Sequence, residues 1–552
     1  MTEQPSRRTT TFAAKIALLI LIMAAGAIPW VINARFHIHY FDEPYFITNG
    51  LNYQATPLAP LTGWITGLVG DLIDWEWLKF RYIHIALYFT ATLIGVIYML
   101  KRVENFATVA TVAATCVLVP GLRTYMNYYG WDSYSALEIA LLTVVTLSYL
   151  THRSSLKIVI LGLLTAIAGL TRIPNFAAAA FIATAIVIID YNKDTTPIKQ
   201  RLLAALAYIT LTLAFSTGAI IVLYGSVANY ISAFSENPTG QHNLLAVLYG
   251  YIVGATLTAP HIAMFCCGYH VLNLCERKHR SSYFITAIVA ALAYYVYITT
   301  NYYSSMAISM IIPAAMAVPL IAMVAYRDRR CRLNGKSGLA LTLLALSCVP
   351  FIGSNCHILR FGVWPAIPIA IGLLEGKRIK GIMLVALAFG IGYVAPHLYQ
   401  TFSNSINSND TRLNCGVMRG MNSKGYSRQG KQFIESMYAD FSSYNDKPGT
   451  EAIVLHDGCY YVWDYLFLKR NDYIGNRFPD PGFLNDPGYV EWAAEKIASA
   501  KRPIAVLLVT AEGYDPKNVH EPTEMEKMLD GCLHKVVSKE GHLIYVSEKG
   551  MS

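Results

Sequence analysis

Long apolar runs separated by short polar stretches occupy the first 400 residues of the chain. About thirteen of these runs approach the 20 or so residues that an α-helix needs to cross a bilayer. We therefore expect an α-helical polytopic membrane protein with about thirteen transmembrane helices. The predicted spans are residues 11–34, 81–100, 105–121, 133–151, 157–171, 174–191, 202–225, 244–274, 283–301, 304–326, 339–353, 361–375 and 381–397.

The pattern changes after residue 400, where apolar runs shorten to the length of β-strands. Such runs occupy residues 452–455, 504–509 and 542–546, and helical patterns lie between them at 431–441 and 489–500. This alternation predicts a small α/β domain. The expected division is a transmembrane domain over residues 1–400 and an α/β domain over residues 401–552.

The polar stretch between the first two spans, residues 35–80, is not apolar enough to cross a membrane. Within it, residues 63–75 are apolar on one side and carry Asp and Trp. This composition favours an amphipathic helix that lies in the membrane interface.

Charge predicts the orientation of the spans. The chain has 552 residues, of which 54% are apolar and 14% charged, with a net charge of +9. Most of the basic residues cluster in alternate loops, and such loops are cytoplasmic under the positive-inside rule. The amino terminus is therefore predicted to be cytoplasmic and the carboxy-terminal domain extracytoplasmic, and the net positive charge is explained without a nucleic-acid partner. The basic clusters lie at residues 7–8, 101–102, 153–157, 193–201, 277–280, 327–336 and 377–380.

The ten cysteines form no CxxC pair and no Cys/His array with zinc spacing. Cys415, Cys459 and Cys532 fall in the predicted outer domain, where a disulfide is chemically permitted. The sequence leaves their pairing open.

Carboxylates gather where the chain leaves the predicted outer face of the membrane. Asp42 and Glu43 follow the first span, and Asp132 precedes the fourth. Acidic residues near hydrocarbon are costly, which makes them candidates for a functional site. The alternative is an ordinary interfacial loop, in which Tyr40, Phe41 and Tyr45 form an aromatic belt.

Isolated arginines share the same predicted face: Arg81, Arg123, Arg172 and Arg360. An arginine fork binds phosphate with two hydrogen bonds, and a carboxylate can take the proton of a hydroxyl that attacks an anomeric carbon. Together these residue types predict glycosyl transfer from a lipid-linked phosphosugar. The alternative is that the arginines anchor helix ends or pair with the acids.

These motifs resemble the GT-C superfamily of polyprenyl-phosphate-sugar glycosyltransferases, which includes protein O-mannosyltransferases and lipid A aminoarabinose transferases. Asp42-Glu43 is similar to the family's acidic pair after the first helix. The resemblance covers about residues 10–400 and includes the span count and the outer carboxy-terminal domain. Its other elements are Pro57-Leu58 leading to Arg81, Asp132 at the fourth helix, the Thr171-Arg172 turn after the fifth, and Arg360-Phe361 followed by Pro365 and Pro368.

The resemblance implies a role for each residue. Asp42 would be the general base, Glu43 would orient it or bind sugar, and Asp132 would support acceptor or sugar hydroxyls. Arg172 and Arg360 would hold the donor phosphate, with Arg81 and Arg123 as further candidates, and His39, Tyr45, Tyr128 and Tyr129 would contact the sugar or acceptor. We expect no cofactor. Relatives with lipid pyrophosphate donors bind a divalent metal through such acids, so a metal stays an alternative.

The predicted function is an inverting glycosyltransferase in the membrane, with a bacterial inner membrane as the expected location. The sugar would move from a polyprenyl-phosphate donor to an extracytoplasmic glycan, lipid or protein. The loops at residues 235–242 and 301–304 match no family signature, so the acceptor stays open. One alternative is a transporter or flippase of lipid-linked sugars, although its ionisable residues would be expected near the bilayer midplane. Another is a polymerase or ligase that uses lipid pyrophosphate glycans.

Overall fold

A computed structural model describes the chain over residues 5–35, 42–118, 129–189, 196–236, 428–456, 483–510 and 522–547. A few single positions within these ranges are excepted, and isolated positions are described between residues 245 and 421. The predicted spans from residue 244 to residue 397 therefore lie almost wholly outside the described residues.

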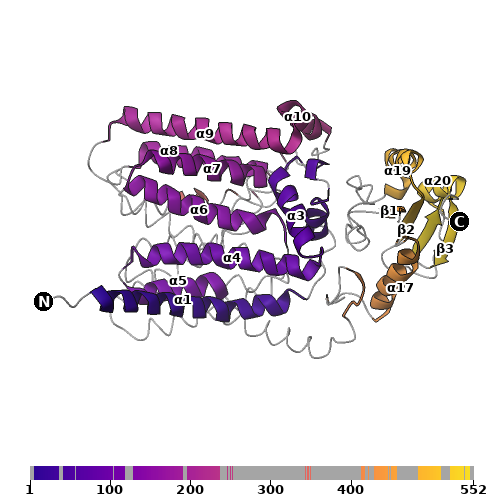
Figure 1. Cartoon of the computed structure of the whole chain (residues 1–552), viewed down its shortest axis with the longest axis horizontal. Coiled ribbons are helices and arrows are strands. Elements are labelled where there is room, and N and C mark those ends of the chain that lie inside the picture. The colour runs from indigo at the N-terminus through magenta and orange to yellow at the C-terminus, as the bar shows by residue number, and fades with distance from the viewer. Residues whose placement is uncertain are drawn as a thin grey trace.

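Helices that run side by side make up the amino-terminal half of the described chain (Figure 1). Each of the first seven predicted spans coincides with a helix, because a continuous apolar run can satisfy its backbone groups in lipid only as a helix. In sequence order, α1 packs on α4 and α5, α4 on α6, α6 on α7, and α7 and α8 on α9. The bounds are α1 Pro5–Asn33, α4 Trp77–Leu100, α5 Phe106–Leu118, α6 Trp131–Thr151, α7 Ser155–Thr171, α8 Ala177–Ile188 and α9 Ile198–Tyr224.

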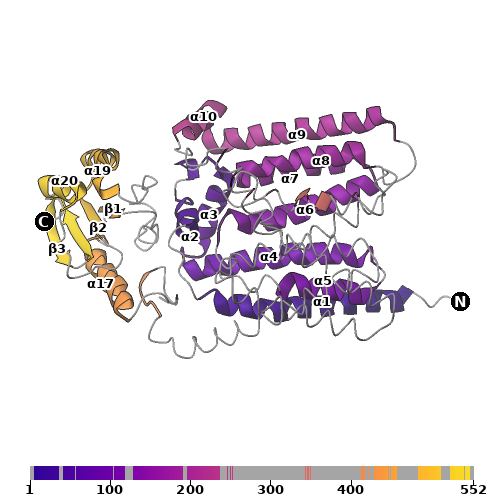
Figure 2. The same ribbon diagram turned by 180° about the vertical axis from the view of Figure 1, so that it is seen from behind.

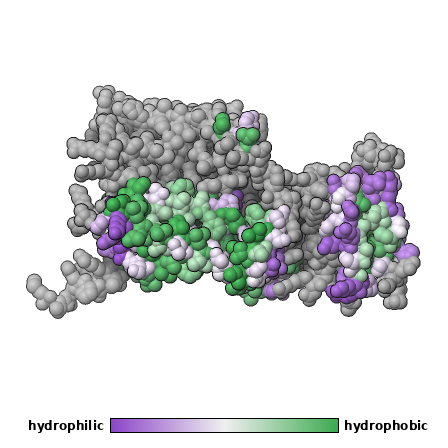
Figure 3. Space-filling view, turned by 90° about the horizontal axis from the view of Figure 1, so that it is seen from above, coloured by the Kyte–Doolittle hydropathy of each residue, from purple (hydrophilic) through white to green (hydrophobic). Residues whose placement is uncertain are grey.

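Among the described residues, four helical segments are long and apolar enough to cross a membrane: Phe12–Ile32, Trp77–Leu100, Ser133–Thr151 and Ile198–Tyr224. The outer surface of α9 is apolar, with Leu206, Leu213 and Val222 exposed. Figure 3 shows apolar side chains over the helical part and hydrophilic ones concentrated over the carboxy-terminal part. Exposed leucine and valine on a long helix fit contact with lipid, and the chain is a multi-pass membrane protein.

Short helices cover one end of the bundle (Figures 1 and 2). They are α2 Asp42–Thr48, η1 Tyr53–Ala55, α3 Pro60–Leu72 and α10 Val227–Glu236. The helix predicted over residues 63–75 is α3, but the prediction of its end was wrong by three residues. Asp74 and Trp75 have φ angles of 57° and 56°, and the amide of Trp75 donates to the carbonyl of Gly70, so the chain turns back after Leu72 into α4.

The carboxy-terminal residues form a four-stranded sheet in the order β1-β2-β4-β3. Its strands are β1 Glu451–His456, β2 Ile504–Val509, β3 His534–Lys539 and β4 His542–Val546. β1 and β2 are parallel, and β4 is antiparallel to both β2 and β3. The strands predicted at residues 452–455, 504–509 and 542–546 coincide with β1, β2 and β4, whereas β3 was missed because its exposed, polar sequence lacks an apolar run.

Helices cover both faces of this sheet. Alternate residues of β2 reach opposite faces, as the twofold period of a strand requires. Ala505 and Leu507 belong to an apolar cluster with α17, while Val506 and Leu508 belong to one with α19 and α20. Burial on both faces explains why β2 is apolar at all six positions. The helix bounds are α17 Arg428–Asn445, α19 Pro487–Ser499 and α20 Glu524–Cys532, and a short η8 spans Phe483–Asn485.

Candidate active site

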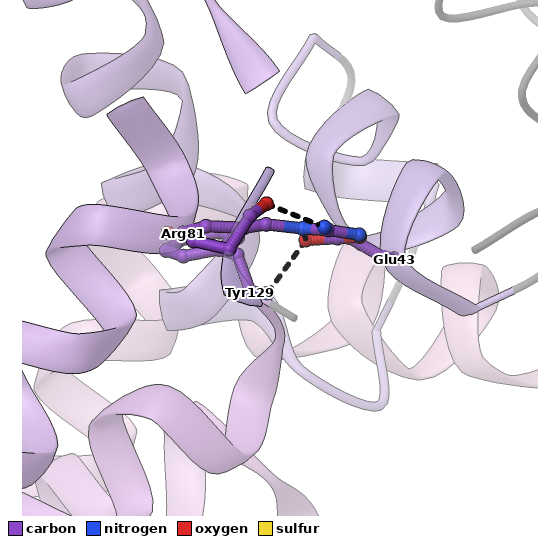
Figure 4. Close-up of polar contacts among 4 residues, drawn as sticks. Glu43, Arg81 and Tyr129 are labelled. Carbon is purple, nitrogen blue, oxygen red and sulfur yellow. Dashed lines mark hydrogen bonds and ion pairs between the residues drawn. The ribbon is translucent and has the colours of Figure 1, made fainter. Parts of the chain in front are cut away.

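A buried ion pair joins α2 to α4 at the end of the bundle that carries α3. Arg81 Nε lies 2.8 Å from Glu43 Oε1 and 3.1 Å from Oε2, and Arg81 Nη2 lies 2.5 Å from Oε2. The two planar groups meet edge to edge, which is the geometry in which a guanidinium binds a carboxylate most strongly (Figure 4). Glu43 is 0% and Arg81 2% exposed, so each charge depends on the other for compensation.

Two further contacts tie this pair to the ends of other helices. Arg81 Nη1 donates to the carbonyl of Ala34, just after α1, at 2.7 Å. The amide of Tyr129, just before α6, donates to Glu43 Oε1 at 3.0 Å (Figure 4). The guanidinium also stands over the ring of Trp77, 5.6 Å from its centroid. The pair therefore fixes α1, α2, α4 and α6 relative to one another.

The start of α6 is secured by a second set of polar contacts. Ser133 Oγ accepts a hydrogen bond from the amide of Gly130 at 2.9 Å. His84 Nδ1, on α4, lies 2.8 Å from the same oxygen. These contacts fix the turn at which Asp132 enters the helix.

A chain of hydroxyl groups connects α3 to α6. Thr66 Oγ1 lies 2.8 Å from the hydroxyl of Tyr129, which is hydrogen-bonded in turn to the hydroxyl of Tyr134. Burial raises the pKa of Tyr129 well above its usual range, so this hydroxyl stays neutral at physiological pH. Tyr129 therefore offers the site a neutral hydroxyl and not a base.

The Thr171-Arg172 turn at the end of α7 is held by α3 and α6. Thr62 Oγ1 donates to the carbonyl of Thr171 at 2.8 Å, and Thr171 Oγ1 donates to Glu138 Oε1 at 2.5 Å. The next residues form a single 3-10 turn, η4 Ile173–Phe176, whose first amide donates to the carbonyl of Leu58 at 3.0 Å. Arg172 itself is 8% exposed, in extended conformation between the two helices.

Helix α3 connects the two halves of the site, which are the Glu43–Arg81 pair and the Thr171-Arg172 turn. Thr62 and Thr66 lie one helical turn apart, so their side chains project from the same face. Thr62 binds the turn that carries Arg172, and Thr66 binds Tyr129, whose amide contacts Glu43. Hydrogen bonds of Tyr129, Thr66 and Thr62, with helix α3 between the two threonines, thus connect Glu43 to the Arg172 turn.

The predicted residues fall into three groups. Glu43, Arg81, Tyr129 and Arg172 are described with their side chains and lie in the connected set above. Asp42 is the first residue of α2, Asp132 the second of α6, and Tyr45 lies within α2, but their side chains lie outside the described part. His39, Arg123, Tyr128 and Arg360 lie wholly outside the described residues.

Arg81 was predicted as a candidate for the donor phosphate. The structure directs its guanidinium to Glu43 and to the carbonyl of Ala34. Several of its five N–H groups are thereby engaged in buried hydrogen bonds. The alternative stated for the arginines, pairing with an acid, is the arrangement observed for this one.

Several site residues were not singled out in the sequence. Thr62, Thr66, His84 and Ser133 gave no signal, because they are common polar residues in otherwise apolar stretches. Glu138 did give one, since it is the single acidic residue inside the predicted span 133–151 and an ionisable residue within a span suggests function.

In the described residues, no group of three or more His, Cys, Asp and Glu side chains comes together. Of the three acids proposed as ligands, only Glu43 has a described side chain, and both of its oxygens are engaged by Arg81. Glu43 as placed does not fit a metal ligand, and the side chains of Asp42 and Asp132 lie outside the described residues.

Comparison with known proteins gave matches only among solved structures. No family model and no curated protein matches the chain. One match is the crystal structure of the Archaeoglobus fulgidus oligosaccharyltransferase in complex with zinc and sulfate, at 12% identity and a TM-score of 0.48. The match covers 89% of this chain and 68% of the oligosaccharyltransferase chain. ArnT from Cupriavidus metallidurans in the apo state is also 12% identical, with a TM-score of 0.42. This match covers 97% of this chain and 98% of the ArnT chain.

ArnT bound to undecaprenyl phosphate is similar as well, at 12% identity, a TM-score of 0.40 and coverage of 96% and 97%. The structural neighbours are thus an oligosaccharyltransferase and ArnT.

Proposed function

We propose that the chain is an integral-membrane inverting glycosyltransferase that takes its sugar from a polyprenyl-phosphate donor. One observation carries the proposal: Asp42 adjoins the Glu43–Arg81 pair, and hydrogen bonds through α3 connect that pair to the turn that carries Arg172. Asp42 and Arg172, the proposed base and a proposed phosphate ligand, thus belong to segments that are connected at one end of the helical bundle. A lipid-linked sugar presents its phosphate at this level of a membrane.

In the proposed reaction Asp42 is the general base. Its carboxylate takes the proton of the acceptor hydroxyl as that oxygen forms a bond to the anomeric carbon. The bond from that carbon to the phosphate oxygen breaks, and both of its electrons leave with the polyprenyl phosphate. Attack from the side opposite the leaving phosphate inverts the anomeric centre.

Arg172 and Arg360 are proposed to hold the phosphate, since a guanidinium fork neutralises the charge that develops on the leaving group. Asp132 is proposed to bind sugar or acceptor hydroxyls from the first turn of α6. The Glu43–Arg81 pair takes a positioning role, because its groups are directed at each other and at backbone atoms. The acceptor would lie on the extracytoplasmic side of a bacterial inner membrane, beside the carboxy-terminal sheet.

The test is transfer by purified protein supplied with a panel of polyprenyl-phosphate sugars. We expect at least one of them to release free polyprenyl phosphate. Asp42→Asn keeps the size of the side chain but cannot take the proton, so transfer should fall by about 10²-fold or more while donor binding persists. The matched control is Asp74→Asn, which changes an exposed carboxylate in the turn between α3 and α4.

Two other outcomes would indicate a different class of protein. Binding of phosphosugars without release of lipid phosphate would indicate a transporter or flippase. Transfer only from pyrophosphate-linked glycans would indicate the polymerase or ligase. An Asp42→Asn variant that transfers at the wild-type rate would falsify the assignment of the base.

A further inference from the structure

A polar cluster around Glu138 and Asn175 lies deeper in the bundle than Asp132. Glu138 is on α6 six residues after Asp132, which places it about 9 Å farther along the helix at 1.5 Å per residue. Glu138 is 7% and Asn175 0% exposed. Buried polar atoms in proteins nearly always have hydrogen-bond partners, so exceptions call for an explanation.

Two acceptor atoms of this cluster have no partner among the described residues. They are Glu138 Oε2 and Asn175 Oδ1. The other polar atom of each side chain is engaged: Thr171 donates to Glu138 Oε1 at 2.5 Å, and Asn175 Nδ2 donates to Ser135 Oγ at 3.1 Å. Ser135 and Glu138 lie three residues apart on α6, so the two contacts belong to neighbouring turns of one face.

Thr171 cannot satisfy the carboxylate by itself. Its hydroxyl carries one hydrogen, and two acceptors compete for it: Glu138 Oε1 and the carbonyl of Ile167, which lies 3.0 Å away. Among the described residues the cluster is therefore short of hydrogen-bond donors. A molecule that fills this need has to bring donors of its own, and the hydroxyl groups of a sugar are such donors.

We propose that Glu138 and Asn175 form a subsite for hydroxyl groups of the sugar on the polyprenyl-phosphate donor. The subsite adjoins the Thr171-Arg172 turn through the contact of Thr171 with Glu138, and Arg172 is the residue proposed to hold the phosphate that carries the sugar. This inference rests on the proposed function and adds the residues that recognise the sugar.

The test compares two kinds of probe, undecaprenyl phosphate alone and undecaprenyl phosphate that carries a sugar. Dissociation constants are measured for undecaprenyl phosphate and for its mannose, glucose and galactose esters, with the full-length protein in detergent. The ratio of the constant for bare lipid to that for an ester isolates the contribution of the sugar. In the wild type we expect this ratio to exceed one for at least one ester.

Glu138→Ala removes the acceptor, and we expect the ratio to fall about tenfold, the scale of one hydrogen bond. Glu138→Gln keeps one acceptor oxygen and can still contact Thr171, so the ratio should fall less, about threefold. This conservative variant supplies the answer if Glu138→Ala does not fold. Arg172→Ala should weaken the binding of bare lipid and ester alike and leave the ratio unchanged.

The control is Thr92→Ala, which removes a buried hydroxyl that donates to the carbonyl of Tyr88 within its own helix. An unchanged ratio in the Glu138 variants would overturn the inference. So would an equal loss of affinity for both probes, because Glu138 would then only hold the Arg172 turn in place. Wild-type protein that binds neither probe would refute the proposed function itself, and the subsite with it.

Discussion

Glu43 and Arg81 remove two charges from water at the centre of the site. Each would be strongly destabilising alone, since a buried charge needs both a partner and hydrogen bonds to its remaining atoms. Here Glu43 accepts from Arg81 and from the amide of Tyr129, and Arg81 also donates to Ala34. The pair thereby sets where α2 begins, and with it the position of Asp42.

Breaking this pair should cost stability as well as activity. Arg81→Ala leaves the Glu43 carboxylate buried without compensation, and we expect it to lower the free energy of unfolding by about 3–5 kcal/mol. The double variant Arg81→Met with Glu43→Gln should be nearly as stable as the wild type, because two neutral side chains of similar volume replace the two charges. Thermal unfolding in detergent measures both. A stable Arg81→Ala protein would mean that the pair does not brace the helix ends.

The residue types of the site could be predicted from the sequence, but their partners could not. An acid or an arginine beside an apolar run is visible because hydrocarbon penalises charge. The contact of Glu43 with Arg81 spans 38 positions and follows from helix packing, which a pattern of apolar residues does not specify. Glu138 was overlooked because one acid hardly changes the mean hydropathy of residues 133–151.

At the scale of elements, close packing of α3 on the loop after α2 keeps the two halves of the site together. Gly50 and Gly67 approach so closely that a Cβ added to Gly67 would lie 2.6 Å from the carbonyl oxygen of Gly50. No side chain can rotate away there, because the obstructing atom belongs to the backbone. The contact thus requires glycine at position 67.

Gly67→Ala should therefore push α3 away from α2. We expect a lower melting temperature and reduced transfer, because Thr62 and Thr66 move with the helix. Gly218→Ala is the matched control, since a Cβ at Gly218 on α9 meets nothing within 4 Å and alanine favours helix there by about 0.5–1 kcal/mol. Equal behaviour of the two variants would show that the approach of α3 to residue 50 is not needed.

In the carboxy-terminal sheet, Asp440 on α17 joins β3 and β4. Its Oδ2 lies 2.5 Å from Lys539 Nζ and 3.1 Å from His542 Nε2. Partial burial acts to raise the pKa of this carboxyl, but the hydrogen bonds from Lys539 and His542 together outweigh it and lower the pKa. A carboxyl with a lowered pKa in the folded state stabilises that state at pH values above its unfolded pKa of about 3.9.

Asp440→Asn should accordingly lower the melting temperature at neutral pH. The difference from the wild type should shrink as the pH falls below about 4, because the wild-type carboxylate is then protonated too. Melting curves recorded from pH 3 to pH 7 measure this difference. Glu524→Gln, which changes an exposed pair with Lys527, should show no such trend. A difference independent of pH would exclude charge as the origin.

At the scale of the whole molecule, the order of apolar runs was enough to predict the seven long helices of the described amino-terminal part. Each run is apolar along its full length, and an apolar segment in lipid can satisfy its backbone groups only as a helix. Composition is therefore enough to predict a helix there. The same reasoning could not find α2 or α10, which are short and half polar. It found the strands that are buried but missed β3, whose exposed side chains follow no apolar pattern.

The whole chain also makes a prediction about sidedness. The loop between α6 and α7 belongs to the predicted cytoplasmic set, through Arg153 and Lys157, whereas α17 follows the last predicted span and is expected outside. Figure 1 places the sheet beyond the end of the bundle that carries α3, and the predicted odd number of spans would put that end outside. The candidate site would then face the extracytoplasmic side.

Cysteines introduced at Ser155 and Ser443, both exposed, test this orientation. A membrane-impermeant maleimide added to intact spheroplasts should modify Ser443→Cys and spare Ser155→Cys, and detergent should make both reactive. Mass spectrometry of the modified peptides separates the introduced cysteines from native ones such as exposed Cys532. The reverse pattern would put Asp42 and Arg172 on the cytoplasmic side, where the proposed extracytoplasmic acceptor could not reach them.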